Sequence, residues 1–337
     1  MSTILTLPAC DLAALRRIQT VRVRSADELR SALRQGRERS LALDASGLDR
    51  VLRFDGPRNT LEMQAATPWT ALAEYLAPRG ISLQAFARTA DMPQTVGAAV
   101  SQNAAGPDGR PLCAHVAAIA LVTPDGELRR ADRESNRELF RLALGGHGLF
   151  GVLYSVTLRL ESLQRSAGEA RAPAELSIAD AGVAASAGCA IECLLPPSEL
   201  DAHLADVRAL AEERRIALHG ISVRRYLPEQ DTFLPWSSRE WAGVTVRFGT
   251  KPTLGARVHA AEIRRLLLAM ALGRGGSFPI RDPGDATREQ LEACYPALSA
   301  FLAEKRRCDP AERLQNDWYR RARAKLRGTA CEVRWGR

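Results

Sequence analysis

The stretch TVGAAVSQNAAG, from Thr95 to Gly106, decides the fold of this chain. Its small side chains let a backbone approach a ligand closely, and exposed N–H groups in such a turn can hold phosphate oxygens. Ser101 and Asn103 add side chains that form hydrogen bonds. The alternative interpretation is a tightly packed turn between a strand and a helix, because turns rich in Gly and Ala commonly serve packing.

A second glycine-bearing stretch, GGHGLFGV at Gly145–Val152, follows a predicted helix and enters a predicted strand. Glycines at this place permit positive φ at a helix end, or the close approach of a flat ligand. The chain has no GxSxG elbow, HExxH, P-loop or GxGxxG that opens a helix after a strand. Its five histidines lie far apart without ligand spacing, so no metal site is predicted.

Outward from these stretches, residues 20–160 alternate strand-like runs with short helices. Capping boxes at Ser25 with Glu28 and at Ser135 with Glu138 predict two helix starts. Alternating or continuous apolar residues predict strands at Val21–Arg24, Leu61–Gln64, Val116–Thr123 and Leu153–Leu160.

Beyond residue 172 the pattern changes to longer elements. Three strands are predicted at Ala190–Leu194, Gly220–Arg225 and Val244–Phe248, with covering helices at Ser198–Arg214 and Arg257–Leu272. Strands that share long amphipathic helices indicate an α+β lobe rather than a doubly wound parallel sheet. The region Ala286–Arg327 is predicted to be helical, with a break at Pro296.

The order and spacing of these motifs resemble the FAD-binding lobe of the FAD-linked oxidases, the vanillyl-alcohol oxidase superfamily. The motifs that carry the resemblance are Asp44–Val51 (D-x-S-x-L-x-x-V), Gln64–Trp69 (Q-A-G-x-x-W), Thr95–Gly106 (T-V-G-G-x-x-S-x-N-x-H-G) and Gly145–Val152. Tyr295-Pro296, Asp309-Pro310 and Asn316 resemble the closing helices of one branch, which contains sugar-lactone and alditol oxidases and decaprenylphosphoryl-ribose oxidase.

The resemblance implies an α+β fold with a PCMH-type FAD-binding lobe and an α+β substrate lobe, or cap. Helices at the C-terminus are then expected to return to the FAD lobe. The implied divisions are an N-terminal extension at 1–19, the FAD-binding domain at 20–165, the cap domain at 166–280 and a helical segment at 281–337.

The resemblance also implies a site. FAD would be held non-covalently by Gly97, Ala98, Ser101, Asn103, Gly106, Gly146, Gly151 and Val152. Arg281 falls where the branch places an active-site lysine and would supply positive charge, and Arg225 is a weaker candidate on the substrate side. The implied reaction is hydride transfer to flavin N5 from a secondary alcohol of a polyol, a sugar lactone or a related substrate.

The chain departs from the family in one large feature. A strand and a glycine-rich R-G-G-G-H-S loop normally precede the D-x-S-x-L motif, but here Arg37–Ser40 runs directly into Leu41–Asp44. Three lost hydrogen bonds to a pyrophosphate, at ~1.5–3 kcal/mol each, would weaken FAD binding by roughly three to six orders of magnitude. Ala98 and Ala105 also replace a glycine and a histidine of the motif.

Two functions follow from this combination. The retained flavin segments favour an FAD-dependent oxidoreductase with a small alcohol or sugar substrate. The missing loop favours a degenerate family member that no longer binds FAD and serves as a binding or scaffold partner of another protein. A shifted site for another nucleotide has no support from particular residues.

Composition excludes several other classes. The net charge is +8, but 47 basic residues minus 3 lysines leave 44 arginines scattered among acids, so no nucleic-acid partner is predicted. Seven cysteines without paired spacing favour a reducing compartment and a cytoplasmic location. The apolar runs are too short for a membrane span, and residues 1–10 do not have the features of a signal sequence.

Overall fold

The computed structural model describes residues 3–4, 19–35, 41–89, 92–170, 174–176, 188–250, 253–281 and 283–327. The chain forms two compact units. Unit 1 comprises residues 1–170, 229–235 and 297–337, and unit 2 comprises 171–228 and 236–296. The segment expected at 281–337 is thus divided between the units at residue 297. None of the described helices is both long and apolar enough to cross a bilayer.

A small three-stranded sheet begins unit 1. β2 (Gln19–Arg22) and β3 (Leu41–Asp44) pair in parallel, and β1 (Thr3–Ile4) pairs antiparallel with β3. Between β2 and β3, the chain forms α1 (Ala26–Gln35). Ser25 Oγ accepts a hydrogen bond from Glu28 N at its start, so the first predicted cap is confirmed. α1 ends at Gln35 and β3 begins at Leu41, so five residues link these two elements.

The larger sheet of unit 1 is antiparallel, with strand order β4-β5-β8-β6-β7. Its strands are β4 (Val51–Asp55), β5 (Thr60–Gln64), β6 (Val116–Val122), β7 (Leu128–Asp132) and β8 (Val152–Arg159). Leu61, Met63 and Val156 share a buried core with Trp69 and Val96 of the neighbouring helices. The strands predicted for residues 61–64, 116–123 and 153–160 are therefore confirmed to within one residue at either end.

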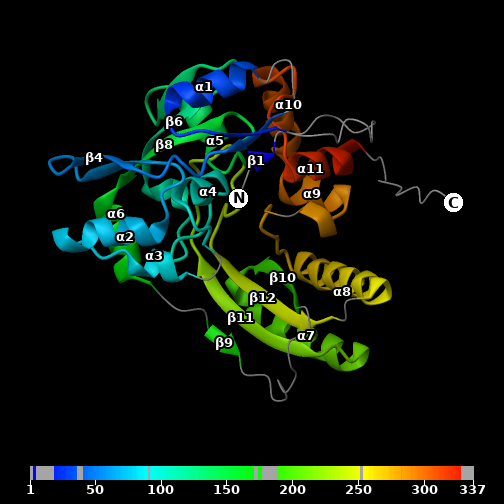
Figure 1. Cartoon of the computed structure of the whole chain (residues 1–337). Helices are drawn as coiled ribbons and strands as arrows, with labels where there is room; N and C mark the ends of the chain where they lie inside the picture. Colours follow the sequence, from blue (N-terminus) through cyan, green and yellow to red (C-terminus); the bar gives the residue numbers. More distant parts are fainter. Residues whose placement is uncertain are drawn as a thin grey trace. The chain divides into compact units, whose positions relative to one another are not determined.

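Short helices complete this unit (Figure 1). They are α2 (Trp69–Leu76), η2 (Ala77–Arg79), α3 (Gln84–Arg88), α4 (Val96–Ser101), η3 (Leu112–His115), α5 (Arg137–Ala143), α6 (Leu160–Gly168), α10 (Leu298–Cys308) and α11 (Asp317–Arg327). The capping box predicted at Ser135 is wrong, because Asn136 is the N-cap of α5, with φ 51°, and makes no side-chain cap. Ser135 N instead bonds to Asp132 Oδ1 in the preceding turn.

Unit 2 is a four-stranded antiparallel sheet with strand order β10-β12-β11-β9. Its elements are β9 (Ala174–Leu176), β10 (Gly188–Leu195), η4 (Pro197–Glu199), α7 (Leu200–Arg214), β11 (Leu218–Tyr226), β12 (Trp241–Gly249), α8 (Leu254–Gly273), η5 (Pro283–Asp285) and α9 (Arg288–Cys294). One face of the sheet packs on α7 and α8 (Figure 1). The α+β class is confirmed.

Alternation along the strands gives the sheet of unit 2 a second, more polar face. Ile221 and Val223 of β11 belong to the core under the helices, as do Val244 and Val246 of β12. Because successive side chains of a strand point to opposite faces, the residues between them point away from that core. This second face carries Glu192 of β10 and Tyr226 of β11.

Candidate functional site

The first glycine-bearing stretch forms α4 and the turn after it, which joins α4 to η3. Thr95 is the N-cap of α4. The N–H groups of the first turn all bond to protein oxygens, at 3.0 Å for Val96 to Thr67 O, 2.7 Å for Gly97 to Ala65 O and 3.3 Å for Ala98 to Thr95 Oγ1. This helix start therefore has no free donor at these three positions for a phosphate group.

Gly97 and Gly106 are held by close packing. A Cβ at Gly97 would lie 2.6 Å from both the Cβ and the carbonyl oxygen of Ala65. At Gly106 it would lie 3.2 Å from Arg110 O, whose carbonyl accepts the Gly106 N–H at 2.7 Å. The structure thus supplies a packing reason for each of these glycines.

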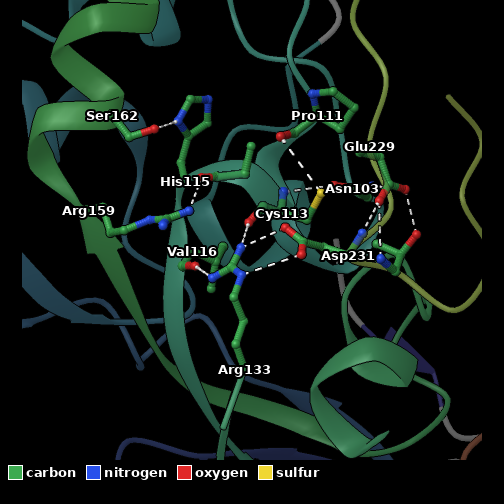
Figure 2. A network of polar contacts seen from close by, with 12 residues as sticks. Asn103, Pro111, Cys113, His115, Val116, Arg133, Arg159, Ser162, Glu229 and Asp231 are labelled. Carbon is green, nitrogen blue, oxygen red and sulfur yellow. Dashed lines mark hydrogen bonds and ion pairs between the residues drawn. The ribbon is translucent and has the colours of Figure 1, made fainter. Parts of the chain in front are cut away.

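Asn103 is the centre of a buried polar network (Figure 2). Its backbone is left-handed, with φ 47°. The side-chain Oδ1 accepts from Cys113 N at 2.9 Å, and Nδ2 donates to Glu229 Oε1 at 3.2 Å. Both ends of the amide are used by the protein, so Asn103 holds the turn after α4 in place.

Glu229 anchors the segment 229–235 in unit 1 through the same network. It accepts from the Thr232 hydroxyl at 2.5 Å and from the N–H groups of Asp231 and Thr232. Burial raises the pKa of its carboxyl group. Asp231 forms an ion pair with Arg133 at 2.7 Å, and Figure 2 shows Arg133 reaching on to backbone oxygens. A segment distant in sequence is thereby fastened beside α4.

The second glycine-bearing stretch turns from α5 into β8. Gly145, with φ 67°, donates to Val100 O at 3.1 Å. An added Cβ would lie 2.0 Å from Leu142 O at Gly146 and 2.6 Å from the Leu121 side chain at Gly151. Val152 begins β8 and pairs with Val122 of β6. Most of this stretch is therefore tightly packed against its own unit.

Ser101 and Gly148 form the open part of this region. Gly148 has φ 74°, and a Cβ there would meet nothing nearer than Ser101 Oγ at 4.0 Å. Neither Ser101 Oγ nor the Gly148 N–H has a hydrogen-bond partner among the described residues. Next to Gly148, His147 stacks on Trp318 at 4.3 Å between ring centroids. Ser101 and Gly148 thus offer a hydroxyl and an N–H that no other described residue binds, and Gly148 directly follows His147 of the stacked pair.

The site in unit 2 is a pocket of about 410 Å³ between β10, α8 and the segment that leads to η5. Its charged lining is Glu192, Arg264, Arg281 and Asp285, and its apolar lining includes Leu268, Phe278 and Pro279. Arg264 binds Asp285 through two nitrogens, at 2.7 and 3.1 Å, and Arg281 forms an ion pair with Glu192. Two positive and two negative groups leave the lining with no formal net charge.

The two predicted catalytic arginines both lie in unit 2. Arg281 lines the pocket, with its side chain 39% exposed. Arg225 lies on β11 and forms two hydrogen bonds with Glu240, at 2.7 and 2.8 Å, near the solvent. Arg224, one position earlier, lies 5.5 Å over the Tyr226 ring, on the polar face of the sheet.

Sequence reasoning missed Glu192 and Tyr226. The Tyr226 hydroxyl donates to the Glu192 carboxylate, which also receives Arg281. Neither residue stands in a recognisable motif, and the partners are 34 and 89 positions from Glu192. Among the described side chains, no group of three or more His, Cys, Asp and Glu gathers as a metal site would.

Comparison with known proteins finds a family match over part of the chain. Residues 11–132 match the family described as FAD binding domain. The structure superposes on chitooligosaccharide oxidase with TM-score 0.65, covering 89% of this chain and 90% of that one at 10% identity. Residues 11–132 are thus similar to an FAD binding domain, and the fold is similar to that of chitooligosaccharide oxidase. A Physcomitrella patens BBE-like 1 structure gives TM-score 0.62 at 11% identity, covering 88% of this chain and 89% of that one.

Two plant enzymes are similar in part of the sequence. L-galactono-1,4-lactone dehydrogenase 2, mitochondrial, of Oryza sativa subsp. japonica is 34% identical over 127 residues, which cover 35% of this chain and 21% of that protein. The Arabidopsis thaliana L-galactono-1,4-lactone dehydrogenase is 32% identical over 126 residues, covering 37% and 20%. The matches thus span about a fifth of the length of these relatives.

The matching family is described as FAD binding domain, and the described residues fit FAD only in part. Ser101 and Gly148 leave a hydroxyl and an N–H open beside planar rings, which suits a flavin edge. The first turn of α4 offers the pyrophosphate no donor, because Val96, Gly97 and Ala98 donate to protein oxygens. The start of α4 therefore offers no phosphate donor at these three positions.

Proposed function

We propose that this chain is an FAD-linked oxidase that oxidises a secondary alcohol of a neutral polyol or sugar lactone, with non-covalently bound FAD as the oxidant. The match of residues 11–132 to the FAD binding domain carries the proposal. When bound, the flavin would supply a hydride acceptor at N5. The names of the related lactone dehydrogenases and of chitooligosaccharide oxidase support a carbohydrate substrate.

The pocket of unit 2 supports a neutral substrate over a sugar acid or sugar phosphate. Arg264 and Arg281 each have a carboxylate partner, so neither brings an uncompensated positive charge to the pocket. An anion would have to displace a carboxylate from its arginine, whereas hydroxyl groups can join these pairs as added donors and acceptors. Apolar surface from Phe278, Pro279 and Leu268 suits the C–H face of a sugar.

Within this proposal the chain's own residues bind and orient. Ser101 and Gly148 would hold one edge of the flavin through a hydroxyl and an N–H. The predicted cofactor residues Gly97, Asn103 and Gly106 would act by shaping the turn. Arg281 would keep positive charge beside the reacting oxygen, and a guanidinium cannot serve there as a proton shuttle.

A flavin spectrum tests the proposal. The purified protein is mixed with excess FAD and desalted, and its absorption is recorded between about 350 and 500 nm. A retained flavin band that bleaches anaerobically with D-sorbitol or L-galactono-1,4-lactone is the expected result. A protein that stays colourless, and whose melting temperature added FAD does not change, would refute the proposed function.

A degenerate member that no longer binds FAD is the second candidate. The internal bonding of the α4 first turn and the short link between α1 and β3 favour it. It predicts a colourless protein whose unit 1 is fully folded, with a protein partner in place of a cofactor. A cytoplasmic location stays a prediction under either candidate, and the plant relatives carry mitochondrial names.

A further inference from the structure

β4 forms one edge of the five-stranded sheet of unit 1 (Figure 1). Among the described strands only β5 pairs with it, so every second N–H and C=O group of β4 points outward without a strand partner there. Such a row of backbone groups is a template for a further strand. Residues 53–55 pair with β5 in regular register, and the one irregularity lies between Val51 and Arg53. The second half of β4 is therefore a regular strand edge.

Two large apolar side chains are exposed on β4. Leu52 is 40% exposed and Phe54 is 39% exposed, whereas most large apolar side chains of the described residues are buried. Phe54 lies opposite Leu61 of the buried core, so its ring is on the face of the sheet that packs on the helices. There Arg79 of η2 lies 5.4 Å from the centre of the ring and covers part of it. An apolar group brought to this edge would bury the remainder.

Charged side chains on the other face of β4 make the edge complementary to itself. Arg53 and Asp55 form an ion pair at 3.0 Å, and the Arg53 side chain is 68% exposed. When two copies of β4 lie antiparallel around a two-fold axis, the register depends on which residue faces its own copy. With Arg53 or Asp55 on the axis, like charges stand directly opposite each other, which is unfavourable. With Phe54 on the axis, each Arg53 lies opposite the partner's Asp55, and the two Phe54 rings meet.

We propose that unit 1 self-associates through β4, so that the partner of this edge is a second copy of this chain. The two β4 strands pair antiparallel with Phe54 on the two-fold axis, and the sheets of both copies join into one. Main-chain hydrogen bonds supply the contact, two Arg53–Asp55 ion pairs fix the register, and Phe54 and Leu52 bury apolar surface. Each Arg53 exchanges its own Asp55 for the partner's. Because the contact is small, the dimer is weak and depends on concentration.

Sedimentation velocity over a concentration series measures the association. The sedimentation coefficient of the wild-type protein should rise from that of a monomer toward that of a dimer as the protein concentration increases. Phe54→Asp places two like charges on the axis and removes the apolar contact, so it should weaken the dimer by about tenfold or more. The matched control is Leu128→Asp, which changes a similarly exposed apolar residue on β7, the other edge strand, and should dimerise as the wild type does.

Exchange of charges tests the register. In the proposed dimer, Arg53→Asp alone sets carboxylates opposite each other, and Asp55→Arg alone sets guanidinium groups opposite each other, so each variant should be monomeric. A mixture of the two variants restores opposite charges at both contacts and should give a heterodimer. Melting temperatures show whether each variant is folded, which matters because Asp55 also accepts the Arg58 N–H at 3.1 Å.

Three results would overturn the proposal. A wild-type protein that stays monomeric at every concentration has no second copy at this edge. A dimer that Phe54→Asp and Arg53→Asp both leave unchanged uses another surface. A mixture of the two charge variants that stays monomeric, although both are folded, rules out the register with Phe54 on the axis. None of these measurements involves a flavin or a substrate, so their outcome is independent of the proposed function.

Discussion

Gly97→Ala separates a packing glycine from a phosphate-binding one. In the structure, the new Cβ would lie 2.6 Å from Ala65 Cβ and from Ala65 O, where ordinary contact begins near 3.4 Å. The helix start and the Ala65 backbone must therefore separate by about 0.8 Å, because a carbonyl oxygen cannot rotate away as the end of a flexible side chain can. The Gly97 N–H bond to the same carbonyl, now 2.7 Å, would lengthen or break.

The expected loss of stability has two parts. Overpacking in a well-packed core costs about 1–3 kcal/mol, and a weakened hydrogen bond costs about 0.5–1.5 kcal/mol. The sum is about 2–4 kcal/mol, which corresponds to a fall in melting temperature of about 4–15 °C for a unit of this size. Scanning calorimetry of the FAD-free protein measures this change without any contribution from the cofactor.

Gly168→Ala is the matched control, because a Cβ at the end of α6 meets nothing within 4 Å. This variant should melt within about 2 °C of the wild type or slightly above it, since alanine is the better helix former. The packing argument is refuted if Gly97→Ala melts at the wild-type temperature. If the melting temperature of Gly97→Ala is unchanged but its FAD affinity falls, Gly97 is a phosphate-binding glycine. Flavin fluorescence measures that affinity.

Three further predictions follow from individual contacts. Ser101→Leu should fill the space beside Gly148 and weaken FAD binding at least tenfold in a fluorescence titration, with little change in melting temperature. Burial lowers the pKa of His115 from 6.5 to about 4, so the unfolded chain binds its proton first as pH falls. Stability in urea should thus decline by up to about 2 kcal/mol from pH 7 to pH 5, and His115→Gln should remove that part of the decline. Asp309→Ala leaves Lys305 buried without its ion-pair partner and should lower the free energy of unfolding in urea by about 3–5 kcal/mol. Adding Lys305→Met to the same chain removes the buried charge and should recover much of that loss.

The fold was largely predictable because its elements depend on near neighbours. Apolar alternation predicted β5 and β8. The cap predicted at Ser135 failed because the side chain of Asp132, three residues earlier, took the Ser135 N–H into a turn. Local patterns thus predicted the elements, and competition between neighbouring polar groups decided one boundary.

The candidate site was less predictable, because glycine in a sequence does not say why it is there. Gly97 and Gly148 both stand in stretches that resemble flavin-binding motifs. Only the structure shows that Gly97 is pressed against Ala65 while Gly148 faces open space beside Ser101. The difference depends on which strand or helix passes close by, and spacing along the chain does not contain that information.

The sequence by itself indicated the α+β class, the likeness to an FAD binding domain and the short link between α1 and β3. Tertiary structure alone decided which side chains meet. Asn103 meets Glu229 across 126 positions, and Glu192 meets Arg281 across 89. Helix and strand patterns reflect contacts a few residues apart, whereas these pairs depend on strand register and on Gly243 leaving room for Tyr226. These side chains come together only when the strands have paired.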